Sequence, residues 1–361
     1  MRNITPPLVS VCCHTYNHAP YIRQCLDGFV MQKTKFSIEV IIHDDASTDG
    51  TTDIIREYEQ KYPEIIKAIY QTENQHLQGI NIFMKFIFPR MQGKYLAFCE
   101  GDDYWIDEYK LQKQFEFMEA NEDFSICFHP VKVFKEEEGI FVRNNTVPDV
   151  PDTTDIKTLA VENFINTPSV MYRFDKKVFD DLVNFPVLAV GDYLYHMLFA
   201  KNGKIKKLPD TMAVYRVHKL GIWSSKTPDY THPIYLKLIE SLIIYFNKEP
   251  EVSGILKEQY SNIVNGLFGY YAVSNGGIIP KDIFVQIMSF SEEMFYSIIT
   301  KNIVENCIFK ETVYYSLNKR HGITLFLTII LRFYRKVNYV INQISHCFKS
   351  GTCTLFHGEN P

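Results

Sequence analysis

The chain has 361 residues and a mass of 42.2 kDa, a length that predicts about two domains. Apolar residues make up 46% and charged residues 22%, which excludes a disordered or collagen-like chain. The 38 Lys and Arg against 42 Asp and Glu give a net charge of −4. This balance provides no basic field to capture phosphates, so a nucleic acid is excluded as the main partner.

The cysteines and the hydropathy pattern bear on the cellular compartment. The eight cysteines form no Cys-x-x-Cys pair and no zinc or disulfide spacing, so we expect reduced, mostly buried thiols. Residues 1–11 contain no apolar core of a secretory signal. No stretch reaches the roughly 18 uninterrupted apolar residues that a spanning helix needs. We therefore expect a cytoplasmic protein.

The first hundred residues alternate between strand and helix patterns. Apolar periodicity and capping residues predict strands at 8–13, 36–43, 65–70 and 95–99, and helices at 21–31, 51–62 and 81–88. Such alternation predicts a mostly parallel sheet with right-handed crossovers and helices on both faces. The residues 1–105 are therefore expected to form an α/β half of the nucleotide-binding type.

The following residues complete this domain and then become helical. We expect a helix at 108–121, strands at 125–134, 168–172 and 212–217, a long loop at 144–157, and a helix that begins near Asp192. The acidic run 136–138 predicts a solvated hairpin tip. From residue 233 onward the pattern is helical almost throughout. We thus expect a second half at 106–230 and a helical C-terminal region at 231–361.

Two aspartate pairs follow predicted strands. Asp44 and Asp45 close the second strand, and Asp102 and Asp103 follow the fourth. Ligands of parallel sheets collect at the carboxyl ends of the strands. Either pair alone is explained equally well by turn and capping carboxylates. Together they favour a divalent cation on a diphosphate, or a hydroxyl-rich ligand, because such an occupant relieves the repulsion between carboxylates.

Three segments carry a resemblance to a known family, and they read VSVCCHTYNHAPYIRQCLDG, VIIHDDASTDGTTDII and GKYLAFCEGDDYWIDEYKLQKQ. In this order and spacing they resemble the family 2 glycosyltransferases, inverting enzymes with the Rossmann-like GT-A fold, over about residues 7–225. The resemblance implies that the base and ribose of a nucleotide sugar are held by Thr15, Tyr16, Asn17, Asp44 and Asp45, with Asp44 accepting from a uracil or thymine imide. Gln78, Gly79 and Asn81 fall in the segment beside the nucleotide, with helix capping as the alternative.

The resemblance also implies a metal site. Asp102 is expected to face the ribose, and Asp103 to bind Mg²⁺ or Mn²⁺ on the diphosphate. Such an ion stabilises the negative charge that develops on the leaving oxygen. His218 lies in register with a His-containing loop of the family and is expected to be a third ligand, with a packing role as the alternative. Trp223 is expected to stack on a sugar ring.

The catalytic base is expected at the start of a helix in the second half. An inverting displacement needs a group that removes the proton from the attacking hydroxyl, and a carboxylate suffices. The matching residue is Asp192. The family commonly has a Glu-Asp pair, whereas this chain has Gly191 before the aspartate. An N-cap role for Asp192 is the alternative.

The C-terminal tail is basic in a chain that is acidic overall. Residues 319–349 carry six Lys and Arg, no Asp or Glu, and apolar residues at helical spacing. Such an amphipathic helix can lie on an anionic membrane surface. Packing of its apolar face on the catalytic domain is an equal alternative. The protein would in the first case be peripheral at the inner face of the membrane.

The pattern as a whole predicts a metal-dependent inverting glycosyltransferase. It would move one sugar from a nucleoside-diphosphate sugar, with UDP expected, to a saccharide or lipid-linked acceptor in cell-surface polysaccharide synthesis. A sugar-nucleotidyltransferase is one alternative, but HTYNHAP lacks the Gly-rich basic loop expected after its first strand. A non-catalytic binding or scaffold protein on the same fold is the other.

Overall fold

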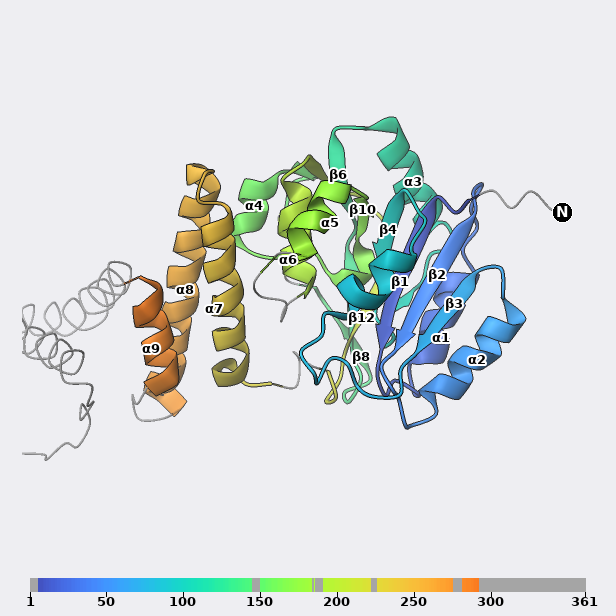
Figure 1. Ribbon diagram of the computed structural model, residues 1–361, viewed down its shortest axis with the longest axis horizontal. Coiled ribbons are helices and arrows are strands. Elements are labelled where there is room, and N and C mark those ends of the chain that lie inside the picture. The colour runs from blue at the N-terminus through green and yellow to red at the C-terminus, as the bar shows by residue number, and fades with distance from the viewer. Residues whose placement is uncertain are drawn as a thin grey trace, which may run out of the picture. The chain divides into compact units, whose positions relative to one another are not determined.

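The computed structural model describes residues 6–144, 150–183, 185, 191–221, 226–274 and 281–291. Trp223 and the basic tail at 319–349 lie outside the described residues. The chain divides into two compact units, residues 1–278 and 279–361. The first holds both sheets and helices α1 to α8, and the second includes helix α9 (Lys281–Phe290) (Figure 1). The predicted domain boundary near residue 230 stays a prediction.

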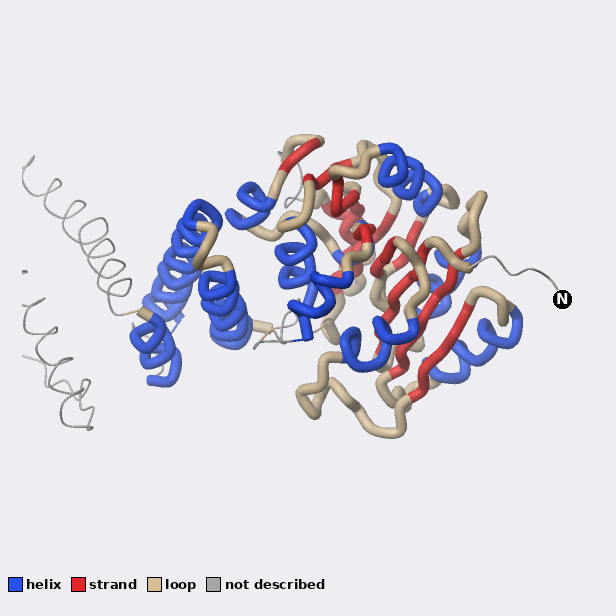
Figure 2. The backbone as a smooth tube through the Cα atoms, turned by 45° about the horizontal axis from the view of Figure 1, so that its top comes forward, coloured by secondary structure: helices blue, strands red, loops and turns tan. Residues whose placement is uncertain are grey.

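Four parallel strands form one side of the main sheet. Their spatial order is β3 (Ile66–Tyr70), β2 (Ile38–Asp44), β1 (Val9–Thr15) and β4 (Tyr95–Phe98). Helices α1 (Ile22–Val30) and α2 (Thr51–Lys61) connect the first three (Figure 2). Strands β1, β2 and β4 are almost continuously buried, as expected of a parallel sheet covered on both faces, whereas the edge strand β3 is buried only at Ile66. The predicted alternation is therefore confirmed, with boundaries within two residues.

The main sheet continues as a mixed sheet of eight strands. Strand β10 (Met171–Arg173) runs antiparallel between β4 and β6 (Phe124–Phe128), and β11 (Lys204–Lys207) and β9 (Thr153–Thr154) complete that side. The neighbouring helices are α3 (Lys110–Ala120), α4 (Ile156–Val161), α5 (Lys176–Val183) and α6 (Gly191–Ala200). A short turn η3 (Thr167–Ser169) precedes β10.

A second sheet of four strands lies beside the first. Its order is β5 (Tyr104–Trp105), β12 (Ala213–Val217), β7 (Val131–Lys135) and β8 (Ile140–Val142). The single strand predicted at 125–134 is wrong in this respect: the chain leaves the first sheet at His129 and Pro130 and enters the second. The helix predicted at 81–88 is a π turn η1 (Phe83–Ile87) followed by a 3₁₀ turn η2 (Phe88–Arg90). Pro89 explains the change, because it lacks the N–H that an α-helix needs there.

The helical region after the sheets is confirmed where it is described. Helix α7 (Pro228–Tyr245) packs against α8 (Pro250–Ser274), which also contacts α4. No helix in the described ranges is both long enough and apolar enough to cross a membrane. The five cysteines of the described part are buried and free, as predicted. Trp105 is buried in the core, where its indole N–H donates to the Pro168 carbonyl at 2.9 Å.

Candidate active site

The carboxyl ends of β1, β2 and β4 meet at one edge of the main sheet. Thr15 at the end of β1 pairs with Asp44 at the end of β2. The turn after β4 comes so close that a Cβ on Gly101 would lie 2.5 Å from the Thr15 hydroxyl oxygen. Only glycine permits this approach. The two predicted acidic pairs therefore lie at the same edge of the sheet.

Asp44 and Asn17 stabilise the turns next to them. The Asp44 carboxylate accepts hydrogen bonds from the Ser47 N–H at 3.1 Å and from the Thr52 hydroxyl. Asn17 has φ 55°, in the left-handed region that asparagine tolerates, and its side chain accepts from the Thr48 N–H at 2.9 Å. These bonds hold the loop after β2 beside the loop after β1.

Three other predicted nucleotide-binding residues differ in exposure. Thr15 is buried, with its hydroxyl 3.1 Å from Nδ1 of His18. Tyr16 is 38% exposed beside it. Gln78 is exposed and donates to Glu73 of its own loop at 3.2 Å. Of the three, Tyr16 alone presents a large ring to solvent at the sheet edge.

Asp45 holds the loop that follows β3. Its two carboxylate oxygens accept from the N–H groups of Gln75 at 2.7 Å and His76 at 3.0 Å. Burial acts to raise the pKa of Asp45, but the His14 imidazole and these two N–H groups outweigh it and hold the pKa below its usual range. Asp45 is therefore ionised, and it holds the loop whose residue His76 lines the neighbouring pocket.

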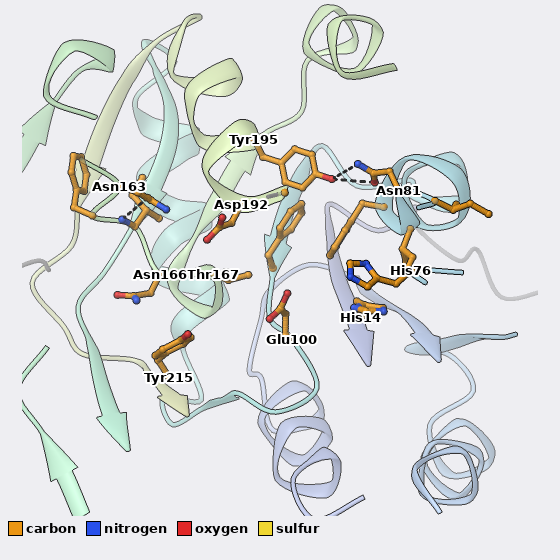
Figure 3. A pocket seen from close by; sticks show the side chains of 17 residues that line it. His14, His76, Asn81, Glu100, Asn163, Asn166, Thr167, Asp192, Tyr195 and Tyr215 are labelled. Atoms are coloured by element: carbon orange, nitrogen blue, oxygen red, sulfur yellow. Dashed lines mark hydrogen bonds between the residues drawn. The ribbon is translucent and has the colours of Figure 1, made fainter. Parts of the chain in front are cut away.

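A pocket of about 240 Å³ opens at this edge of the sheet. The polar side chains that line it are His14, His76, Asn81, Glu100, Asn163, Asn166, Thr167, Asp192, Tyr195 and Tyr215 (Figure 3). Of the residues predicted from the sequence, this lining includes Asn81 and Asp192. Figure 3 shows the carboxyl groups of Asp192 and Glu100 directed into the same space from two different elements.

Asp192 lies in the first turn of α6, one residue inside the helix rather than at the position that caps it. Its carboxylate accepts from the Tyr193 N–H at 2.6 Å and is also hydrogen-bonded by the Asn163 side chain. Burial dominates over these bonds and raises the pKa of Asp192 above its usual range. A carboxylate with a raised pKa that faces a pocket is suited to accept a proton.

Gly191, at the position where the family resemblance implies an acid, gives room to Tyr195. A Cβ at position 191 would lie 3.2 Å from the Tyr195 ring. That ring is 1% exposed, packs edge-on against Phe98 and shares two 3.2 Å hydrogen bonds with Asn81. Asn81 also accepts from the Met84 N–H of η1 at 3.0 Å. The pair therefore connects the loop after β3 to the helix that carries Asp192.

We expect Gly191→Ala to lower the free energy of unfolding by about 1–3 kcal/mol, the usual cost of overpacking a site that cannot relax. Gly254→Ala in α8 is the matched control, because a Cβ there meets nothing within 4 Å. The control should gain roughly 0.5–1 kcal/mol from the removal of a helical glycine. Urea unfolding of both variants measures the difference, and equal effects would show that Tyr195 can move aside.

Glu100 is a pocket residue that the sequence analysis missed. Burial first, and then the nearby Asp102 and Asp192, raise the pKa of Glu100 to about 8. The carboxyl group is therefore mostly protonated at neutral pH and can donate a hydrogen bond into the pocket. The sequence contains an indication of this role, because Glu100 is the first acidic residue of the run EGDD, which also holds Asp102 and Asp103. His14 and Asn163, also missed, have no comparable signal in the sequence.

Asp102 lies between two histidines. Its Oδ2 is 3.0 Å from Nε2 of His218 and 3.8 Å from Nε2 of His18. Burial acts to raise the pKa of Asp102, but these histidines outweigh it and hold the pKa below its usual range. Oδ1 is buried and has no hydrogen-bond partner among the described residues. Asp102 is therefore an anion with one unsatisfied oxygen.

Asp103 faces a different direction. It is 1% exposed, and its Oδ1 accepts from the Arg216 N–H of β12 at 2.8 Å. Burial, followed by the charge of Asp102, raises the pKa of Asp103 well above its usual range. Its Oδ2 is buried and has no hydrogen-bond partner among the described residues. Neither Asp102 nor Asp103 lines the pocket, but the two carboxylates have different partners, Arg216 for Asp103 and His218 for Asp102.

The unsatisfied oxygen of Asp102 fits a divalent cation. Within the described ranges, no three His, Cys, Asp or Glu side chains are arranged to hold a metal by themselves. Mg²⁺ in particular is usually held by one or two carboxylates together with substrate phosphates. The residues present therefore suit an ion that arrives with a diphosphate better than a permanently bound one.

Comparison with known proteins assigns a family. Residues 10–182 match the family model for glycosyl transferase family 2. An uncharacterized protein of Mycobacterium tuberculosis is 41% identical over 223 residues, which cover 61% of this chain and 62% of that protein. The Escherichia coli UDP-Glc:alpha-D-GlcNAc-diphosphoundecaprenol beta-1,3-glucosyltransferase WfaP is 27% identical over 220 residues, or 61% of this chain and 81% of that protein.

A solved structure resembles the fold over most of the chain. TarS 1–349 of S. aureus, crystallised with UDP-GlcNAc, superposes with a TM-score of 0.56 at 19% identity, covering 80% of this chain and 81% of that one. The chain spans less than two thirds of the mycobacterial relative's length. Residues 10–182, which carry the three motifs and most of the main sheet, therefore match glycosyl transferase family 2, and the mixed sheet has the GT-A fold.

Proposed function

We propose that the protein is a metal-dependent inverting glycosyltransferase that moves one sugar from a UDP-sugar to a saccharide or lipid-linked acceptor in cell-surface polysaccharide synthesis. The observation that carries this proposal is the single pocket at the sheet edge that Asp192 and Glu100 share. The name of the E. coli relative, which includes both UDP-Glc and a diphosphoundecaprenol acceptor, supports the donor and the acceptor class.

Asp192 is the proposed catalytic base. Its ionised carboxylate takes the proton of the acceptor hydroxyl while that oxygen attacks the anomeric carbon of the donor. The bond between this carbon and the diphosphate oxygen breaks, and the nucleoside diphosphate leaves. The Tyr193 N–H and the Asn163 side chain hold the carboxylate in place for the transfer. Attack from the side opposite the leaving group inverts the configuration.

Asp102 is the proposed carboxylate for Mn²⁺ or Mg²⁺, in preference to Asp103. Each of the two has one buried oxygen without a partner among the described residues. Asp102 is preferred because it lies 3.0 Å from His218 and its pKa is held low by the neighbouring histidines, whereas burial raises the pKa of Asp103. Nε2 of His218 lies 3.0 Å from Oδ2 of Asp102. His218 is therefore proposed either to orient Asp102 or to be a further ligand of the same cation. A bound divalent ion would supply Lewis-acid stabilisation of the leaving diphosphate.

The nucleotide is proposed to lie along the ends of β1 and β2. Tyr16 is exposed enough to stack on a base, and Asp45 is ionised next to His14. Asp44 has both oxygens engaged by its own turn, so its proposed contribution is to shape the site rather than to bind the imide directly. Attachment of the basic tail to an anionic membrane surface likewise remains a proposal.

A screen of nucleotide sugars tests the proposed function. We expect UDP-sugars to raise the melting temperature more with Mn²⁺ or Mg²⁺ than without, because a ligand of the native state stabilises by about 2.7 kcal/mol at a hundred times its Kd. Addition of saccharide or lipid-linked acceptors should then release UDP. Formation of pyrophosphate from UTP would instead identify a nucleotidyltransferase, and binding without turnover a scaffold protein.

A further inference from the structure

A buried arginine connects the segment that carries His218 to the Asp102 turn. Arg216 is 7% exposed and lies two residues before His218. Its Nε donates to the Asp102 carbonyl at 2.8 Å, and its Nη2 donates to the Gln24 side chain at 2.7 Å. Its Nη1 donates to the Glu136 carboxylate. One guanidinium therefore joins three separate parts of the chain.

Aromatic rings enclose this guanidinium. Its carbon lies 4.8 Å from the ring centroid of Tyr21, 5.2 Å from that of Tyr104 and 5.7 Å from that of Phe134. A guanidinium at this distance from an aromatic ring is stabilised by a cation–π interaction. The partly desolvated surroundings also strengthen each hydrogen bond of the guanidinium. The orientation of the Arg216 fork is thus closely determined.

The acidic run after β7 is tied to the same segment. The sequence predicted a solvated hairpin tip, and the hairpin between β7 and β8 is present, but Glu136 is paired with Arg216. The next residue, Glu137, accepts from the Lys219 N–H at 2.8 Å. Two consecutive glutamates therefore hold the backbone on both sides of His218. The predicted hairpin tip is confirmed, with Glu137 and Glu138 exposed, but Glu136 and Glu137 are in addition bonded to the segment around His218.

We propose that the Glu136–Arg216 pair is a positioning device that holds Asp102 and His218 in register for a divalent cation carried by the donor diphosphate. This inference rests on the proposed function. The bonds run to the main chain of Asp102 and to the strand end before His218, so they act on the site through its backbone. Partners one step removed from metal ligands typically set affinity by about 10–100-fold.

Glu136→Gln tests the proposal, with Glu138→Gln as the matched control. Glutamine keeps the shape and can still accept from Arg216, so the hairpin should fold. Glu138 belongs to the same run, is 52% exposed in its side chain and pairs with Lys135 at 2.8 Å. We expect Glu136→Gln to weaken Mn²⁺ binding in the presence of UDP by roughly tenfold or more, as measured by titration calorimetry. The control should bind like the wild type.

Kinetics and a second variant separate positioning from stability. In Glu136→Gln, saturating Mn²⁺ should restore most of kcat, since the residue touches neither substrate nor cation. Gln24→Ala removes another Arg216 contact at an exposed helical position and should weaken Mn²⁺ binding in the same direction. Unchanged Mn²⁺ affinity in Glu136→Gln, with or without a lower melting temperature, overturns the proposal. Wild-type protein that fails to bind UDP with Mn²⁺ overturns the proposed function itself.

Discussion

Asp192→Asn is expected to lower kcat by roughly 10²–10⁴ while leaving the donor Kd within a few-fold, the range typical of losing a general base. Asparagine has the same shape and can still accept from the Tyr193 N–H, so the start of α6 should be retained. It cannot take the proton of the acceptor hydroxyl. Steady-state turnover with the donor identified in the screen, together with calorimetric donor binding, measures both quantities.

Asp229→Asn is a matched control, because Asp229 also lies in the first turn of a helix, α7, but does not line the pocket. Its activity should stay near that of the wild type. The pH profile provides a second check on Asp192. Since the base must be ionised and its pKa is raised by burial, kcat should fall as the pH decreases through a value above the ordinary 3.9 or so of an aspartate. Near-normal turnover in Asp192→Asn would rule out this residue as the base.

Asp102→Asn is expected to abolish the part of the UDP-induced rise in melting temperature that depends on Mn²⁺ or Mg²⁺. Turnover should fall by roughly 10³-fold, since a bound cation stabilises the leaving group by several kcal/mol. The rise produced by UDP alone should remain, because the nucleotide contacts at β1 and β2 are intact. Thermal unfolding of the variant with UDP, with and without metal, measures this effect.

Asp103→Asn separates the two members of the pair. Burial raises the pKa of Asp103 well above its usual range, and an amide keeps the shape of the side chain and can still accept from the Arg216 N–H. We expect this variant to keep the metal-dependent stabilisation. If Asp103→Asn loses it and Asp102→Asn does not, the metal site belongs to Asp103, as the family resemblance implied.

The sequence by itself determined the first half of the fold and the edge where the site lies. Buried parallel strands are continuous apolar runs, and the turns between them carry polar caps, so local pattern alone located β1 to β4 and helices α1 and α2. The acidic pairs follow the ends of β2 and β4, and parallel strands bring those ends to one edge. The position of Asp192 near the start of a helix was also predicted from the local sequence pattern.

Elements whose form depends on distant partners could not be read locally. Strand β11 and helix α5 are short, and neither was predicted. The apolar run at 125–134 is continuous in sequence, yet it divides between two sheets because β6 pairs with β10 and β11 while β7 pairs with β12. Pairing of this kind is decided by strands that lie dozens of residues away.

Only the tertiary structure decided which partners surround each acidic side chain. Asp103 is engaged by the backbone of Arg216, 113 residues later, while Asp102 meets His218, 116 residues later. The contact of Asn81 with Tyr195 spans 114 residues and accounts for Gly191. The partners of these two adjacent carboxylates come from β12 and from the residue that follows it. The spacing of residues in the sequence does not reveal those long-range hydrogen bonds. It therefore placed the carboxylates at the carboxyl edge of the main sheet but could not assign their roles.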